Sequence, residues 1–182
     1  MPMHKGPLTI EHAALGLLRQ RPMHAYEMHQ SLRRPDALGL VWRLKQSLLY
    51  AILERLEGEG YLAAEVVPQG NRPPRRLLSL TPLGADAIAR WLGSPVAHGR
   101  DFRIEFLAKL YFARQDGPAA VAALLTVQRQ ACQGWLRDLH GQAAAAADRM
   151  YEWLVLQFRI GQIEATMAWL DTCSATLAPA PR

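Results

Sequence analysis

Three arginines stand close together in a segment made of turn-forming residues. The segment Gln69–Arg76 reads Gln-Gly-Asn-Arg-Pro-Pro-Arg-Arg, so it contains Arg72, Arg75 and Arg76 and no acidic residue. Arginine side chains on a thin hairpin are suited to contact phosphates or to enter a narrow minor groove. A solvated loop without a partner would have the same composition, so the neighbouring elements must decide between these two interpretations.

A second group of polar side chains lies at the start of the strongest helical pattern in the first half of the chain. Apolar residues recur at helical spacing from Leu48 to Leu56, and Gly58 and Gly60 mark the end of the helix. Side chains at the start of such a helix can reach base edges, and its terminal amides can meet phosphate. The residues placed there are Lys45, Gln46, Ser47 and Tyr50. Two alternatives remain open: Tyr50 could be half-buried packing, and Lys45 could be a helix-end charge without a partner.

Helices and a hairpin are predicted around these two groups. Helical patterns cover residues 10–18 and 25–32, and each is stopped by an arginine followed by a proline. Two short strands, 61–67 and 75–80, are joined by the loop that carries the arginines, and a further helix follows. Three helices followed by a β-hairpin form a winged helix, in which the third helix can lie in a DNA major groove and the hairpin is the wing.

The charge distribution favours a polyanionic partner for the first half. Residues 1–100 contain 13 Lys and Arg against 8 Asp and Glu, whereas residues 101–182 contain 8 of each. The whole formal excess of +5 therefore lies with the predicted winged helix. The acidic residues of the third helix oppose phosphate, so we expect its C-terminal half to point away from DNA. They are Glu54, Glu57 and Glu59.

The second half is predicted to be entirely helical. Residues 93–100 form the clearest boundary. We therefore expect a winged-helix DNA-binding domain at 1–93 and a helical dimerisation domain at 101–178. The expected fold class is mainly α with a small β-hairpin.

The last helix carries apolar residues that are spaced alternately by three and four, which is the coiled-coil pattern. They are Trp153, Leu156, Ile160, Ile163, Met167 and Leu170. An uncovered stripe of this length is unfavourable in water. It could pack on the chain's own helix over residues 118–140, on a partner chain, or on both, and we expect it to form a dimer interface.

The aromatic and sulfur-containing residues of the second half raise the question of a sensor. Trp135, Trp153 and Trp169 could stack a planar aromatic effector, although tryptophans at helical spacing more often serve packing. Cys132 and Cys173 could sense redox changes, although lone thiols on apolar helices are usually inert. Both questions stay open on the sequence.

The motifs of enzymes and metal sites are missing. There is no glycine-rich phosphate loop, no Gly-x-Ser-x-Gly elbow and no cluster of metal ligands, so we expect no enzymatic activity, no cofactor and no metal. His24 and His29 are five residues apart, which does not stack them on one helix face. No apolar run approaches the ~18 residues of a membrane span. With only two cysteines, we expect a cytoplasmic protein.

Three motifs, in order along the chain, resemble those of PadR-family transcriptional regulators. They are Pro22-Met-His-Ala-Tyr26-Glu-Met28, then Tyr50-Ala-Ile-Leu53-Glu-Arg-Leu56 with Glu57 to Leu62, then Arg75-Arg76-Leu-Leu-Ser-Leu80-Thr81-Pro-Leu-Gly84. The match spans about residues 8–92, and the helical second half is similar to the family's dimerisation region by pattern and length. Two departures leave the operator sequence unpredictable. Ser47-Leu48-Leu49 replaces residues that are often small or polar, and Leu77-Leu78 replaces residues that are often aromatic.

The resemblance implies a cytoplasmic homodimer that binds a pseudo-palindromic operator in double-stranded DNA, usually as a repressor. It implies DNA contacts at the start of the third helix, at Tyr50 and at the wing. Some family members bind flat aromatic or phenolic effectors near the dimer interface. The alternative is a protein-interaction module in which the winged helix is only a scaffold and no DNA is bound.

Overall fold

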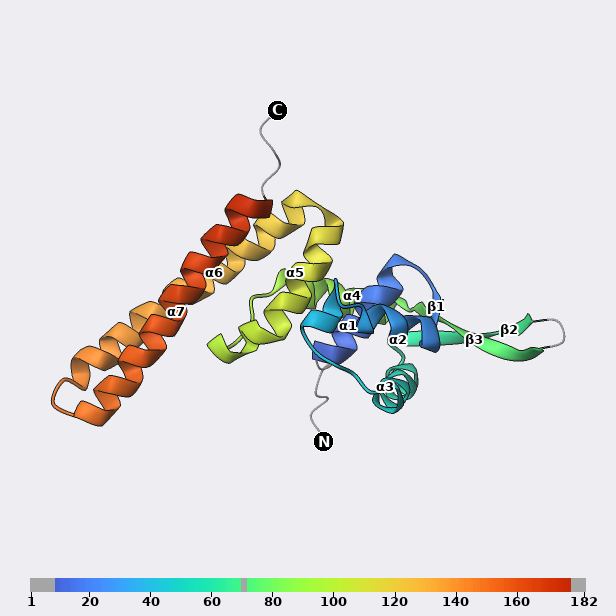
Figure 1. Ribbon diagram of the computed structural model, residues 1–182, viewed down its shortest axis with the longest axis horizontal. Coiled ribbons are helices and arrows are strands. Elements are labelled where there is room, and N and C mark those ends of the chain that lie inside the picture. The colour runs from blue at the N-terminus through green and yellow to red at the C-terminus, as the bar shows by residue number, and fades with distance from the viewer. Residues whose placement is uncertain (1–8, 70–71, 178–182) are drawn as a thin grey trace, which may run out of the picture. The chain divides into compact units, whose positions relative to one another are not determined.

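A computed structural model describes residues 9–69 and 72–177, without the side chains of residues 69 and 72–74. The chain forms two compact units (Figure 1). The first unit runs to Leu92 and also includes Arg103–Phe112, and the second consists of Gly93–Phe102 and the chain from Ala113 onward.

The helices of the first unit follow the punctuation of the sequence. The helix α1 ends just before Arg21-Pro22, and α2 ends just before Arg34-Pro35, because the residue before a proline avoids the helical region. The helices are α1 (Thr9–Gln20), α2 (Ala25–Arg33), the short 3₁₀ helix η1 (Leu38–Leu40), α3 (Gln46–Gly58), α4 (Pro82–Gly93) and α5 (Glu105–Asp116), of which the part up to Phe112 belongs here.

The sheet of the first unit contains the expected hairpin and one additional strand. The hairpin consists of β2 (Leu62–Gln69) and β3 (Arg72–Leu80), paired antiparallel. It projects away from the helices of this unit (Figure 1). The strand β1 (Met23–His24) pairs antiparallel with the other side of β3, so the sheet order is β1-β3-β2. Two residues are too few to show the alternation that marks a strand, and the sequence therefore gives no signal for β1.

The core of the first unit also includes α5, which we expected to open the second domain. Ala108 and Phe112 of α5 belong to the same buried cluster as Leu15 and Ile88. Phe112 lies directly over Gly16 of α1, where an added Cβ would be 2.6 Å from the ring. The predicted boundary at residues 93–100 therefore does not separate two continuous domains, because α5 returns to pack on the winged helix.

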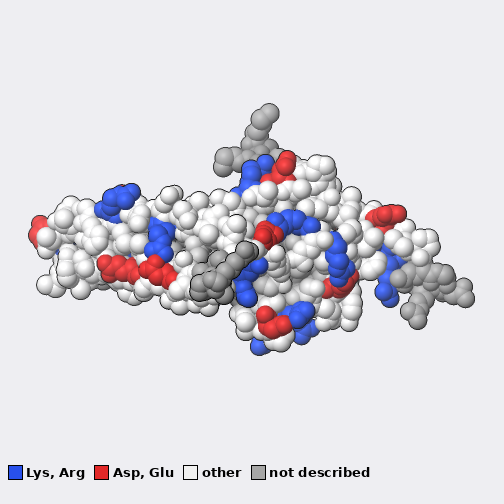
Figure 2. Space-filling model, turned by 90° about the horizontal axis from the view of Figure 1, so that it is seen from above, with Lys and Arg blue, Asp and Glu red and all other residues white. Residues whose placement is uncertain are grey.

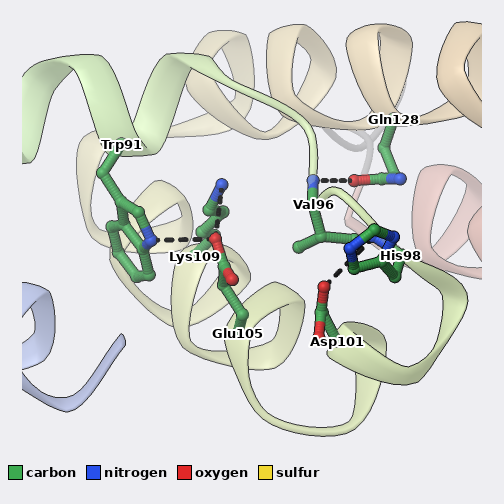
Figure 3. Close-up of polar contacts among 7 residues, drawn as sticks. All are labelled: Trp91, Val96, His98, Asp101, Glu105, Lys109 and Gln128. Carbon is green, nitrogen blue, oxygen red and sulfur yellow. Dashed lines mark hydrogen bonds and ion pairs between the residues drawn. The ribbon is translucent and has the colours of Figure 1, made fainter. Parts of the chain in front are cut away.

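A polar group holds α5 to α4 within the first unit (Figure 3). The indole N–H of Trp91 donates to the Glu105 carboxylate at 3.0 Å. The Lys109 ammonium lies 3.1 Å from the same carboxylate and 5.2 Å from the Trp91 ring centroid. The side chain of Lys109 is completely buried. A buried charge is tolerated only where it is paired, and here Glu105 and the aromatic ring provide the compensation.

The second unit is a helical hairpin with a short 3₁₀ segment. It contains η2 (Gly99–Arg103) up to Phe102, α6 (Pro118–Ala145) and α7 (Met150–Leu177), and the last two lie side by side (Figure 1). The buried side chain of Gln128 accepts a hydrogen bond from the Val96 amide at 2.8 Å, and the Asp101 carboxylate accepts one from the His98 amide at 3.1 Å (Figure 3). None of the helices in the described ranges combines the length and the apolar content that a membrane crossing requires.

Candidate nucleic-acid interface

The wing is fixed at its base by Thr81, the residue between β3 and α4. Its hydroxyl accepts a hydrogen bond from the Gly84 amide at 3.1 Å, which caps α4, and it donates to the carbonyl of Gly60 at 2.7 Å. Its amide donates to the Tyr61 carbonyl at 3.2 Å. A Cβ on Gly84 would lie 2.0 Å from that carbonyl oxygen, so only glycine fits. The motif Thr81–Gly84 therefore joins the hairpin to the end of α3.

The first turn of α3 presents polar side chains and backbone amides to the solvent. Lys45 is the N-cap residue, in an extended conformation and without a side-chain cap, and the first turn carries no acidic residue. Lys45, Gln46 and Ser47 are exposed, and Tyr50 is 46 % exposed. The opposite face of α3 is buried through Leu49, Ile52, Leu53 and Leu56. The positive end of the helix dipole can therefore meet an anion.

A groove of about 720 Å³ lies between α3 and the wing. Residues from α2, α3 and β3 line it, among them Tyr26, Tyr50, Arg75 and Arg76. Tyr26 lies in the first turn of α2 and is 61 % exposed. Sequence reasoning misses Tyr26 as a site residue, although its place in the motif Pro22–Met28 is the signal that could have found it.

The same groove contains acidic side chains. Glu27, Glu54 and Glu57 also line it. Arg76 forms an ion pair with Glu57 across the groove. Arg21 forms another with Glu27, and its hydrogen bond lowers the pKa of that carboxyl. On the face drawn in Figure 2, acidic side chains likewise lie next to basic ones. Glu57 therefore points toward the wing and is compensated by it.

The structure describes the side chains of two of the three wing arginines, Arg75 and Arg76. Arg75 and Arg76 are both exposed. They are adjacent in β3, so their side chains leave opposite faces of the strand, with Arg76 on the face of the buried Leu78. Arg75 forms no ion pair with any described residue. The backbone of Arg72 pairs with Gln69 in the hairpin, and its side chain lies outside the described part of the chain.

The predicted dimer seam on α7 is covered by the chain itself. Leu156 and Ile160 belong to a buried cluster with Ala143 and Ala146, against which Leu136 and Leu139 pack. Ile163 and Leu170 are buried as well, Met167 is partly buried, and Trp153 is 39 % exposed. Of the alternatives considered, packing on the chain's own preceding helix is the one observed. The four buried residues of the seam pack within the chain, and a contact of the seam with a partner chain stays a prediction.

The three predicted effector-binding tryptophans are not brought together in one cavity. Trp135 lines a cavity of about 780 Å³ in the second unit. Arg100, Arg159 and His98 line the same cavity. Trp153 and Trp169 do not line it, and they are 39 % and 37 % exposed.

The two thiols are buried, and burial raises the pKa of Cys132 and of Cys173. A thiol held in its protonated form is a poor nucleophile. Within residues 9–69 and 72–177, no three or more His, Cys, Asp or Glu side chains gather in a group that could hold a metal ion.

The chain matches two models of known protein families. Residues 14–90 match the model of the transcriptional regulator PadR-like family, and residues 102–178 match the model of the virulence activator alpha C-terminal region. Over residues 14–90 the chain is similar to the PadR-like family of transcriptional regulators, and the comparisons support a DNA-binding transcriptional regulator.

This PadR-like chain is similar over most of its length to the negative transcriptional regulator PadR of Bacillus subtilis. The two are 26 % identical over 179 residues, which cover 93 % of this chain and 97 % of the relative. The crystal structure of B. subtilis PadR in complex with operator DNA has a TM-score of 0.48 at 24 % identity and covers 95 % of this chain and 99 % of the other. The structure of that protein in complex with p-coumaric acid has a TM-score of 0.44 at 22 % identity, with 93 % and 99 % covered. No comparison supports a scaffold that binds no DNA.

Proposed function

We propose that this PadR-like regulator is a repressor that acts as a homodimer on a pseudo-palindromic operator in double-stranded DNA. The observation that carries the proposal is the exposed start of α3, which has no side-chain cap, together with Arg75, which lines one groove with Tyr50 and forms no ion pair with a described residue. With α3 in the major groove, Gln46, Ser47 and Tyr50 would reach base edges. The wing would then contact the adjacent backbone or minor groove. A DNA partner and a regulatory family support a cytoplasmic location and a role without enzymatic activity.

Binding to the intergenic DNA beside its own gene, measured over a salt series, tests this proposal. The logarithm of the affinity should fall linearly with that of the salt concentration, by about 0.9 per phosphate neutralised. Arg75→Ala should weaken binding to specific and unrelated duplexes by the same factor, whereas Tyr50→Ala should weaken specific binding more. Arg137→Ala, which removes an exposed arginine of α6, is the matched control and should change neither. A wild-type chain that binds no duplex even at low salt would contradict the proposal.

A second apolar stripe on α7 supports the homodimer. Seven residues spaced by three and four are all exposed, and the first three are large. They are Tyr151, Leu154, Phe158, Gly161, Ala165, Ala168 and Thr172. Each lies two positions from a member of the buried seam, which is about 200° around a helix with 3.6 residues per turn. The helix therefore has two apolar faces, and α6 covers one of them.

A second copy of the same helix is the simplest cover for this exposed stripe. Two such stripes can pack against each other around a two-fold axis, because a C₂ interface uses the same surface on both subunits. The small residues Gly161 and Ala165 in the middle allow the helices to approach closely, while Phe158 and Leu154 supply apolar area. One winged helix makes few base contacts, so the two half-sites of an operator require such a dimer.

Sedimentation of a stripe variant tests the dimer. The wild type should sediment at twice the chain mass of 20.3 kDa. Leu154→Lys combined with Phe158→Lys should sediment as a single chain with unchanged helical circular dichroism, because neither side chain is part of the intrachain core. Glu164→Lys, an exposed charge change on the same helix outside the stripe, should leave the dimer intact. A wild type of single-chain mass at working concentration would contradict the dimer.

The cavity around Trp135 supports a small aromatic effector. Trp135 can stack a planar ring, and Arg100 and Arg159 can pair with a carboxylate. Binding of p-coumaric acid should quench tryptophan fluorescence and weaken DNA binding. Trp135→Phe should remove the quench and Trp169→Phe should retain it. An equal quench in both variants would place the effector elsewhere.

A further inference from the structure

A second cavity of the first unit lies where the chain enters α3. It has a volume of about 820 Å³ and is bounded by the end of α2, by η1 and by the connector that leads to α3. We call it the connector pocket and define it by Arg33, Trp42, Arg43 and Lys45. All three cations are exposed, and the residues that line the pocket include no aspartate or glutamate.

The positive charge of this pocket is not compensated. None of Arg33, Arg43 and Lys45 forms an ion pair with a described residue. The nearest acid in sequence, Asp36, accepts hydrogen bonds from Nε and Nη2 of Arg34 at 3.1 and 2.7 Å, and these bonds lower the pKa of Asp36. Neither Arg34 nor Asp36 lines the pocket. The wing groove, in contrast, has three glutamates for two arginines.

Trp42, which lines the same pocket, carries a buried donor that has no partner among the described residues. Trp42 packs against the core of the first unit, and its indole Nε1 is buried without a hydrogen-bond partner. It is the one such side-chain nitrogen or oxygen in the described part of the chain. Buried polar groups are normally satisfied, so an orphaned N–H calls for an explanation, and an unobserved acceptor is one.

The backbone around the pocket is held in place. The buried His29 ring donates from Nε2 to the carbonyl of Leu44 at 3.1 Å, which fixes the connector one residue before Lys45. The first amides of α3, which have no side-chain cap, open beside Lys45 and Gln46. Three cations and a helix N-terminus thus border one cavity and share one preference, which is an oxyanion.

We propose that the connector pocket binds a backbone phosphate of DNA at the edge of the major groove that α3 enters. This rests on the proposed function. Lys45 and Gln46 belong both to the pocket and to the surface predicted to read bases. With α3 in the major groove, the oxyanion closest to the pocket would be the phosphate that flanks those bases. A free phosphate or a phosphorylated small molecule has the same chemistry and is distinguished below.

Removal of the two arginines tests the pocket. Arg33→Gln combined with Arg43→Gln should weaken binding to specific and unrelated duplexes equally. It should also make the slope of log affinity against log salt concentration shallower by about 0.9 for each lost phosphate contact. A dimer has two such pockets, so the total change should be about two. Arg90→Gln, an exposed arginine at the end of α4, is the matched control and should change nothing.

The source of the phosphate is tested with duplexes that carry one uncharged methylphosphonate linkage at successive positions. One flanking position should weaken the wild type and have no further effect on the Arg33→Gln/Arg43→Gln variant. Two results together would overturn the proposal in favour of a free phosphate: no methylphosphonate position shows this pattern, and inorganic phosphate displaces DNA from the wild type more strongly than chloride does at equal ionic strength. Unchanged affinity and slope in the variant also overturn it, while Arg75→Ala in the same assay shows whether DNA binding itself stands.

Discussion

The two compact units differ in how much of their apolar surface a single chain can cover. The first unit has a continuous apolar core and also encloses a lysine, since Lys109 is completely buried beside Glu105 and Trp91. Its exposed large apolar residues, such as Leu40 and Val66, lie on different elements. In the second unit, α7 leaves Leu154 and Phe158 52 % and 65 % exposed although its other face is buried. The winged helix can therefore owe its stability to its own core, whereas the proposed dimer would supply part of the stability of the helical hairpin.

The largest expected effect comes from a pair of truncations on the two faces of α7. Ile160→Ala should lower the free energy of unfolding by about 3 kcal/mol, because it opens a cavity in the cluster with Leu156 and Ala146. Phe158→Ala removes a larger side chain that the single chain leaves exposed. Its effect should be small at low protein concentration, where the proposed dimer would dissociate, and should grow as the concentration rises. Urea unfolding at several protein concentrations measures both.

The dependence of the Phe158→Ala effect on protein concentration distinguishes the two faces of α7. If Phe158→Ala lowers the stability equally at every concentration, that face is covered within the chain. The difference between the two units would then disappear. If Ile160→Ala costs almost nothing, the α6–α7 packing contributes little to the stability of this unit.

A smaller effect is expected at the base of the wing in the first unit. Gly84→Ala should destabilise the chain by about 2 kcal/mol, because the new Cβ would collide with the Tyr61 carbonyl and backbone cannot yield as a side chain can. Gly58→Ala is the matched control, since a Cβ there meets nothing within 4 Å. The control should gain at most about 1 kcal/mol from helix propensity. Thermal unfolding followed by circular dichroism compares the two, and an equal stability would mean that Thr81–Gly84 does not hold the wing.

The winged helix could be predicted because its signals are local. Proline after arginine ends α1 and α2, glycines end α3, and Thr81-Pro82 begins α4, so each boundary is set by residues next to it. The strand β1 could not be found in this way, since His24 is fixed by contacts with β3 fifty residues later, including a 2.8 Å contact from its Nδ1 to the Arg76 carbonyl.

The features that could not be predicted depend on which surfaces meet. The spacing of α7 contains two apolar stripes, and nothing local indicates that α6 covers the one with Ile160 and leaves the one with Phe158 exposed. The return of α5 rests on Phe112 packing over Gly16, nearly a hundred residues away. The candidate site shows the same limit: an arginine cluster is visible in the sequence, but the pairing of Arg76 with Glu57 is not.

The smallest effect concerns the two thiols, both of which lie in the second unit. Burial raises the pKa of Cys132 and Cys173 above the ordinary thiol value of 9.0. Unfolded thiols then lose their protons at a lower pH than the folded ones, so the stability should fall as the pH rises past that ordinary value. Wild type and the Cys132→Ala/Cys173→Ala variant should therefore differ in the slope of stability against pH above this point. Tyrosines and lysines contribute equally to both, so equal slopes would mean that the thiols are not shielded by the helical hairpin.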